Sequence, residues 1–257
     1  MNTPPHTTKD LLLSNALEKI RFRFVQPDQP GAQWDTTELE KPTAYKGFDV
    51  ANTHIWDQQT PVFDLNLLRT PRLSTVAIAY LFNILVQQMP KNETYLNIGT
   101  WCGFSFFSGI IGNPEKKCIG VDNFSNHHPI QTRTILHQQY QTFRNNNTVF
   151  YEMDYENYFK EIHRGPIGVY FYDGDHAYEH QLKGLEYAHP YLTRGSYTVV
   201  DDTNDNGALS GKGDPYEATL AFVDAHPGEY SIVLDVHTHE NGHPTFWNGL
   251  LILKKTI

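Results

Sequence analysis

The sequence has few of the features that mark secreted or membrane-bound proteins. Its 257 residues include two cysteines, Cys102 and Cys118, which are too few for a disulfide scaffold and typical of a reducing compartment. No run of about 18 apolar residues occurs, and Met1 to Asp10 lack the basic-then-apolar pattern of a signal peptide. We therefore expect no membrane span and a cytoplasmic location.

Basic residues are also scarce. Lys and Arg number 20 against 29 Asp and Glu, so the formal net charge is −9, and no basic block occurs. We therefore expect no binding to nucleic acid or to an anionic membrane surface. Aromatic residues are plentiful, with 15 Phe, 15 Tyr and 4 Trp, and they supply enough large apolar surface to exclude a disordered chain.

The chain divides into an N-terminal part without a sustained period and a strongly patterned remainder. Residues 1–68 are interpreted as an irregular extension holding at most one helix, with a role as a lid or an oligomer contact left open. Residues 69–257 are predicted to form one catalytic domain. It begins with a helix that starts at Thr70-Pro71, because Thr is a good N-cap and Pro fits the first turn, and that ends before Pro90.

Short apolar runs then alternate with helical segments, which is the pattern of a parallel sheet with crossover helices. The predicted strands are 95–98, 118–121, 148–151, 167–172 and 197–200, and the predicted helices lie near 104–111, 130–144, 155–163, 178–191 and 215–225. Two last runs, 230–236 and 247–253, are joined by a turn-rich segment containing Asn241-Gly242, which favours a hairpin. We therefore predict an α/β, doubly wound, Rossmann-like sheet of five parallel strands plus a C-terminal antiparallel hairpin, with helices on both faces.

A glycine-bearing turn follows the first of these strands. Gly99 and Gly103 let the backbone approach a ligand closely, although the motif is neither a dinucleotide fingerprint nor a P-loop, and a turn with two purely structural glycines remains an alternative. The second strand ends in Asp122-Asn123, and an acid 23 residues beyond Gly99 can accept hydrogen bonds from ribose hydroxyls. Together they favour a nucleoside site. After the third strand, Asp154 and Tyr155 suit an adenine ring, or Asp154 is a plain N-cap.

The next two strands deliver a group of carboxylates. Asp173 ends the fourth strand, and Asp201 and Asp202 end the fifth. Because adjacent parallel strands end at one edge of the sheet, these acids can converge, and oxygen ligands suit Mg²⁺, Mn²⁺ or Ca²⁺. His176 lies three residues after Asp173 and is suited to accept a proton at neutral pH. Helix caps and solvated loop acids are the structural alternative.

These segments resemble the class I S-adenosylmethionine-dependent methyltransferases, specifically the metal-dependent O-methyltransferases. The resemblance runs from about Thr70 to the C-terminus and is carried by YLNIGTWCGFS (95–105), GVDNF (120–124), the stretch 170–202 and FWNGLLILKK (246–255). It is nearest to the antibiotic-sugar and cephalosporin-pathway group, in which an Asp-x-x-His precedes an acidic pair.

The resemblance implies a cofactor, a metal and a base. S-adenosylmethionine would be bound by residues of the glycine turn and of the strand ends near it, namely Asn97, Gly99, Thr100, Trp101, Gly103, Ser105, Asp122, Asn123, Asp154, Tyr155 and Asp173. Asp173, Asp201 and Asp202 would bind Mg²⁺ or a similar divalent cation, and His176 would be the general base for a small-molecule hydroxyl acceptor such as a sugar, natural product or phenol. The chain departs from the family at Asn97, where an acid is usual, and at Asp201, where the nearest group tends to have Glu.

Two other functions stay open on the sequence. The first is a catalytically silent cofactor-binding protein, for which Asn97 is the main support. The second is a metal-dependent hydrolase that adds His237, His239 and His243 to the carboxylates, although these histidines read better as exposed turn residues. The loop from Thr203 to Asp214 is glycine-rich and is interpreted either as a mobile lid over the acceptor or as a solvated connector. Oligomer formation is likewise left open.

Overall fold

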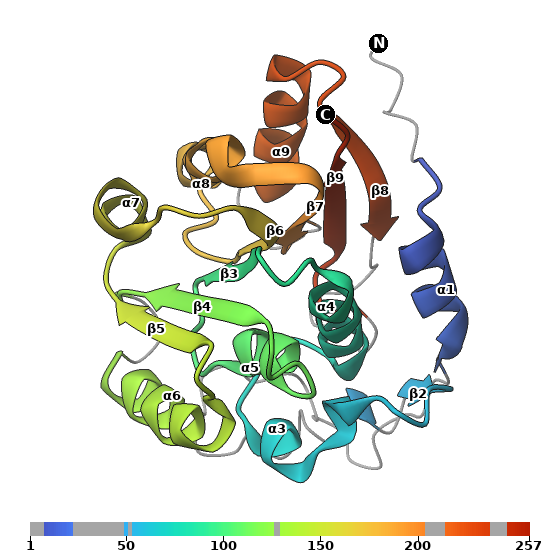
Figure 1. Ribbon diagram of the computed structural model, residues 1–257, viewed down its shortest axis with the longest axis vertical. Coiled ribbons are helices and arrows are strands. Elements are labelled where there is room, and N and C mark those ends of the chain that lie inside the picture. Colours follow the sequence, from blue (N-terminus) through green and yellow to red (C-terminus); the bar gives the residue numbers. More distant parts are fainter. Residues whose placement is uncertain (1–7, 23–48, 51–52, 126–128, 204–213, 237–245) are drawn as a thin grey trace, which may run out of the picture.

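The computed structural model describes residues 8–22, 49–50, 53–125, 129–203, 214–236 and 246–257. They are organised around a seven-stranded sheet with the order β5-β4-β3-β6-β7-β9-β8 (Figure 1). The parallel strands are β3 (Thr94–Ile98), β4 (Lys117–Asp122), β5 (Thr148–Glu152), β6 (Ile167–Tyr172) and β7 (Leu192–Asp201). The strands β8 (Tyr230–Val236) and β9 (Leu250–Lys255) are antiparallel, and β9 lies between β7 and β8. The predicted five parallel strands and C-terminal antiparallel pair are confirmed.

Helices cover both faces of this sheet (Figure 1). One face carries α4 (Val76–Gln88), α5 (Phe104–Ile110) and α6 (Pro129–Phe143), and the other carries α7 (Tyr155–Asn157) with a following π-helical turn (Tyr158–Ile162), α8 (Tyr178–Ala188) and α9 (Asp214–Ala225). Alternate residues of one strand serve the two cores: in β6, Val169 and Phe171 join the first, and Tyr170 and Tyr172 join the second. Strands buried on both faces read as apolar runs, which is why the sequence predicts them well.

The predicted start of the first helix at Thr70 is wrong. Thr70 instead closes the short helix α3 (Leu65–Arg69), and its N–H bonds to Leu67 O. The helix α4 begins at Val76, where the Thr75 side chain accepts from Ile78 N and the Asp49 carboxylate accepts from Val76 N at 2.9 Å. The start of α4 therefore depends on a carboxylate from far along the chain, whereas its end at Gln88, before Pro90, is as predicted.

The last strand also starts later than predicted. Residues 247–249 are not extended, because Trp247 has φ +49° and Gly249 has φ +94°, so β9 begins at Leu250. The preceding turn with Asn241-Gly242 lies outside the described residues.

The described N-terminal residues are more regular than the predicted irregular extension. They form α1 (Leu11–Lys19), the antiparallel pair β1 (Ile20–Phe22) and β2 (Thr53–Ile55), a 3₁₀ turn (Pro61–Phe63) and α3. Asp10 caps α1 and binds the main sheet, since its Oδ2 lies 2.6 Å from Lys254 Nζ and 3.1 Å from Tyr197 Oη. These contacts fix the N-terminal segment to the strands β7 and β9. Its role as a lid or an oligomer contact stays a prediction. None of the helices in the described ranges is long and apolar enough to cross a membrane.

Candidate functional site

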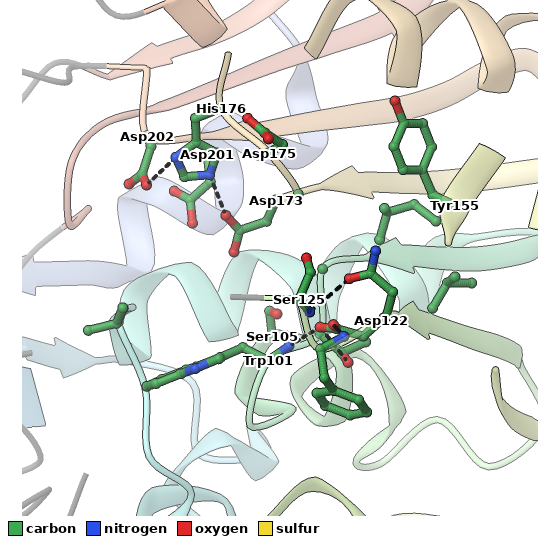
Figure 2. Close-up of a pocket in the computed structure, with 18 of the residues that line it drawn as sticks. Trp101, Ser105, Asp122, Ser125, Tyr155, Asp173, Asp175, His176, Asp201 and Asp202 are labelled. Atoms are coloured by element: carbon green, nitrogen blue, oxygen red, sulfur yellow. Dashed lines mark hydrogen bonds and ion pairs between the residues drawn. The ribbon is translucent and has the colours of Figure 1, made fainter. Parts of the chain in front are cut away.

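A pocket of about 600 Å³ lies at the carboxyl edge of the five parallel strands (Figure 2). Each of these strands contributes its end or the loop after it: residues 98–101, 121–125, 153–155, 173–176 and 201–202. The strand order changes direction at this point. The strand β3 pairs with β4 on one side and with β6, which comes later in the chain, on the other. Open α/β sheets bind ligands at such a switch point.

Most of the predicted site residues line this one pocket. They are Gly99, Thr100, Trp101, Ser105, Asp122, Asn123, Asp154, Tyr155, Asp173, His176, Asp201 and Asp202. Two predicted residues, Asn97 and Gly103, are not part of its wall. The topology therefore brings together residues from five separate segments of the sequence.

Asn97 lies beneath the glycine turn. It is fully buried, and its Nδ2 donates to Tyr95 Oη at 2.9 Å and to Ser105 Oγ at 3.2 Å. The reason is the alternation of β3: Tyr95 faces the core under α4 and α5, and Asn97, two residues on, shares that side. The Asn97 side chain is thus linked to the pocket by its hydrogen bond to Ser105, which does line it.

The two glycines of the turn have different tasks. Gly99 has φ +80°, and a Cβ atom there would lie 1.8 Å from the backbone oxygen of Asp173, so the turn fits directly against the end of β6. Gly103 has φ +96° and precedes α5, where a Cβ would lie 2.2 Å from the Phe107 ring. Gly99 sets the contact with the acidic strand end, and Gly103 sets the packing of the helix.

Asp122 holds the turn in place. Its Oδ2 accepts from Trp101 N at 2.7 Å and its Oδ1 accepts from Phe124 N at 2.7 Å (Figure 2). Burial raises the pKa of the Asp122 carboxyl group, while the two backbone hydrogen bonds act in the opposite direction. A half-buried carboxylate that lines a pocket and is already oriented by backbone donors is well placed to accept hydrogen bonds from a ligand.

Asp154 adopts the role that the sequence left as the alternative. Its Oδ1 accepts from Glu156 N at 2.9 Å and from Asn157 N at 3.4 Å, so it is the N-cap of α7. It also lines the pocket together with Tyr155. The capping bonds fix the carboxylate in the wall of the pocket.

The acidic group at the ends of β6 and β7 is built around His176. Its Nε2 lies 3.1 Å from Asp173 Oδ1, and its Nδ1 lies 3.2 Å from Asp202 Oδ2 (Figure 2). One ligand atom from each of Asp173, His176 and Asp202 lies within 4.8 Å of the others. Asp201 lines the same pocket, is only 4% exposed, and its Oδ1 has no hydrogen-bond partner among the described residues.

The electrostatics of this group favour a cation. Burial of His176 disfavours its charged form, but the hydrogen bond to Asp173 and the charges of Asp202, Asp173 and Asp201 raise its pKa to about 10. Burial, together with the charges of Asp173 and Asp202, raises the pKa of Asp201 well above its ordinary value. A buried, unbonded carboxylate oxygen beside two further carboxylates suits a hard divalent cation, so the residues fit the metal that the sequence suggested.

Several pocket residues were not predicted from the sequence. Ser74 and Arg72 enter from the segment before α4, and Trp247 and Asn248 enter from the segment before β9. Arg72 and Ser74 belong to no motif, and the position of Arg72 depends on a long-range contact, its buried pair with Asp49 at 2.6 Å. Trp247 and Asn248 lie in the segment 246–255 that carries part of the resemblance, but neither was predicted as a site residue. Residues 204–213, which make up most of the predicted lid, and His237, His239 and His243 lie outside the described residues.

Comparisons with known proteins agree with this geometry. Residues 96–203 match the model of a methyltransferase domain family. Over 87 residues, the chain is 38% identical to the rhamnosyl O-methyltransferase of Mycobacterium tuberculosis, covering 31% of this chain and 34% of that protein. The corresponding protein of Mycobacterium leprae is 39% identical over 87 residues, covering 32% of this chain and 37% of that protein. The match thus spans about a third of the length of these curated relatives.

Solved structures extend the likeness to most of the sheet. The O-methyltransferase TomG from Streptomyces achromogenes, in complex with S-adenosylmethionine, is 13% identical, covers 76% of this chain and 91% of its own, and has a TM-score of 0.59. An O-methyltransferase from Bacillus cereus, in complex with S-adenosylhomocysteine, is 14% identical, covers 70% of this chain and 79% of its own, and has a TM-score of 0.51. Residues 96–203 therefore match a methyltransferase domain, and the chain has the fold of these solved O-methyltransferases.

Proposed function

We propose that this protein is an S-adenosylmethionine-dependent O-methyltransferase that acts on a hydroxyl group of a sugar and requires a divalent cation. The observation that carries the proposal is that one pocket contains both the glycine turn with Asp122 and the group formed by Asp173, His176, Asp201 and Asp202. The matched methyltransferase domain spans both parts. The sugar is suggested by the rhamnosyl O-methyltransferases, which share a segment with this chain.

The half of the pocket at β3, β4 and β5 binds the cofactor. Asp122 accepts hydrogen bonds from the ribose hydroxyls, because it is a carboxylate at the end of the strand next to the glycine turn. Gly99 and Ser105 border the methionine part, and Asp154 and Tyr155 border the adenine. Asn97 takes part by fixing Ser105 through its 3.2 Å hydrogen bond.

The half of the pocket at β6 and β7 carries out the chemistry. Asp173, Asp201 and Asp202 hold the divalent cation, which when bound makes an acceptor hydroxyl more acidic and orients it. Asp202 accepts from His176 Nδ1 and fixes the imidazole ring. A bound cation would offset the carboxylate charges that raise the pKa of His176, so that the neutral imidazole, with its Nε2 released from Asp173, would take the proton of the acceptor hydroxyl. The deprotonated oxygen would then form a bond to the methyl carbon, in line with the bond from that carbon to the sulfonium sulfur, which breaks and leaves S-adenosylhomocysteine. Trp247 and Asn248 close the acceptor side among the described residues.

The test combines binding with turnover. Purified protein is titrated calorimetrically with S-adenosylhomocysteine in EDTA, and is then assayed with S-adenosylmethionine and a panel of glycosides and phenols, with products detected by the mass of one added methyl group. We expect S-adenosylhomocysteine to bind without metal, and glycoside methylation to require Mg²⁺ or Mn²⁺.

Three results would contradict parts of this proposal. Failure to bind either form of the cofactor would refute the methyltransferase assignment. Binding without turnover of any acceptor, with metal present, would favour a silent binding protein. Full turnover in EDTA, with the metal content verified as near zero, would refute the role of the carboxylates.

A further inference from the structure

Most of the charged side chains that line the pocket are acidic. Its lining holds Asp122, Asp154, Asp173, Asp175, Asp201 and Asp202. Within the described lining, Arg72 is the one side chain with a permanent positive charge, and no lysine takes part. A divalent cation and a sulfonium cofactor together supply three positive charges against these six carboxylates, and a protonated His176 would supply a fourth, so the loaded pocket keeps a negative potential.

Arg72 does not relieve this potential. Its guanidinium pairs with the Asp49 carboxylate at 2.6 Å and 3.2 Å, and both side chains are 1% exposed. Another of its N–H groups donates to Leu68 O at 2.9 Å, and its face packs 4.9 Å from the centre of the Phe104 ring. The charge of Arg72 is therefore neutralised by its own partner, and it lies by the turn that opens α5 rather than by His176.

Among the described residues that line the pocket, Arg72 has no second arginine or lysine beside it. Asp175 lies next to His176 in the loop before α8, is exposed, and uses its Oδ1 to accept from Ala177 N at 2.9 Å. Lys183 on α8 is held by Glu156 at 2.6 Å. The described lining at the ends of β6 and β7 holds the carboxylates of Asp173, Asp175, Asp201 and Asp202 and the imidazole of His176 (Figure 2). The lining also includes His180, Trp247 and Asn248.

We propose that the acceptor carries no phosphate, sulfate or carboxylate near the methylated hydroxyl, and that a protonated amine at that position strengthens its binding through Asp175. This rests on the proposed function and deepens it, from a sugar hydroxyl to an uncharged or cationic polyol. Carboxylate oxygens pair with O–H and N–H donors, while an anionic group would be repelled by the carboxylates that line the pocket. An amino sugar presents both kinds of donor to Asp175.

The experiment compares three glycosides that differ in charge at one carbon. The neutral glycoside that the turnover panel methylates best is compared with its uronic acid and its amino-sugar counterpart, and kcat/KM is measured at low and high salt. We expect the uronic acid to be at least tenfold worse than the neutral glycoside, and the amino sugar to be about threefold to tenfold better. Both differences shrink at high salt, because screening acts on charge and leaves shape unchanged.

A pair of variants tests the role of Asp175. Asp175→Asn removes the charge but keeps an oxygen to cap Ala177 N, so we expect it to abolish the advantage of the amino sugar and reduce the penalty of the acid. Asp224→Asn, an equally exposed change on α9 outside the pocket, leaves the ranking unchanged. An acid that matches or exceeds the neutral glycoside, or a ranking that salt and Asp175→Asn leave unaltered, would overturn the inference while leaving the methyltransferase function intact. A panel without any methylated glycoside refutes both.

Discussion

Replacing Gly99 by Ala tests whether the glycine turn and the acidic strand end form one unit. The new Cβ would lie 1.8 Å from the Asp173 backbone oxygen and 2.5 Å from its carbonyl carbon, so two stretches of backbone must separate. The separation strains the hydrogen bonds from Gly99 N to Val121 O and from Asp173 N to Ile98 O. The left-handed backbone costs about 1–2 kcal/mol and the overpacking about 1–3 kcal/mol, so we expect a total loss of about 2–5 kcal/mol.

Gly228→Ala is the matched control. Gly228 also has φ +80°, but no atom of the described chain lies within 4 Å of a Cβ built there, so this variant loses only the backbone part, about 1–2 kcal/mol. Urea unfolding measures both losses, and calorimetry with S-adenosylhomocysteine measures binding. We expect at least tenfold weaker binding in Gly99→Ala alone. Equal stability losses and equal affinities in the two variants would refute the close contact between the turn and Asp173.

Three further predictions address single side chains. Asp122→Ala should weaken S-adenosylhomocysteine binding by about 1.5–3 kcal/mol in calorimetry, since a charged acceptor is lost, and unchanged affinity would remove Asp122 from the cofactor site. His176→Asn should lower the methylation rate by about 10²–10⁴ while leaving S-adenosylhomocysteine affinity intact; near-normal turnover would assign the proton to another group. Burial lowers the pKa of His163 to about 4 from 6.5, so its neutral form stabilises the fold fully above pH 6.5, and this contribution is lost as the pH falls through 4. Between pH 7 and pH 5 the wild type should lose about 2 kcal/mol more in urea unfolding than His163→Gln, and parallel losses would contradict this.

The sheet and most of the site were predictable because their signals are local. Each of the five parallel strands is an apolar run, and its pocket residue follows directly, as Asp122 follows Val121 and Asp173 follows Tyr172. Once parallel strands are predicted, their carboxyl ends must share one edge, so the convergence of Asp173, Asp201 and Asp202 follows from the topology.

The features that sequence reasoning missed depend on partners that are distant in the chain. Thr70-Pro71 is a good local helix start, but the Asp49 carboxylate bonds to Val76 N and to Arg72, and these contacts fix the start of α4 five residues later. The N-terminal segment looks irregular in the sequence because a contact that holds it in place is made over a long distance in the chain. Asp10 bonds to Tyr197 and Lys254, which lie near the other end of the sequence. Neither contact leaves a pattern in a window of ten to twenty residues.

The position of the Asn97 side chain changes what its departure from the family pattern implies for cofactor binding. By the family resemblance, an amide in place of an acid implies a weaker or rearranged contact with the ammonium group of the cofactor. In the structure, Asn97 is fully buried on the side of β3 that carries Tyr95, and it donates to Tyr95 Oη and Ser105 Oγ. Because Ser105 Oγ accepts the amide hydrogen, the serine keeps its own hydroxyl hydrogen for another acceptor. A carboxylate at position 97 would accept from Ser105 instead and take up that hydrogen, so the amide preserves a donor at the wall of the pocket, and the departure is compatible with cofactor binding.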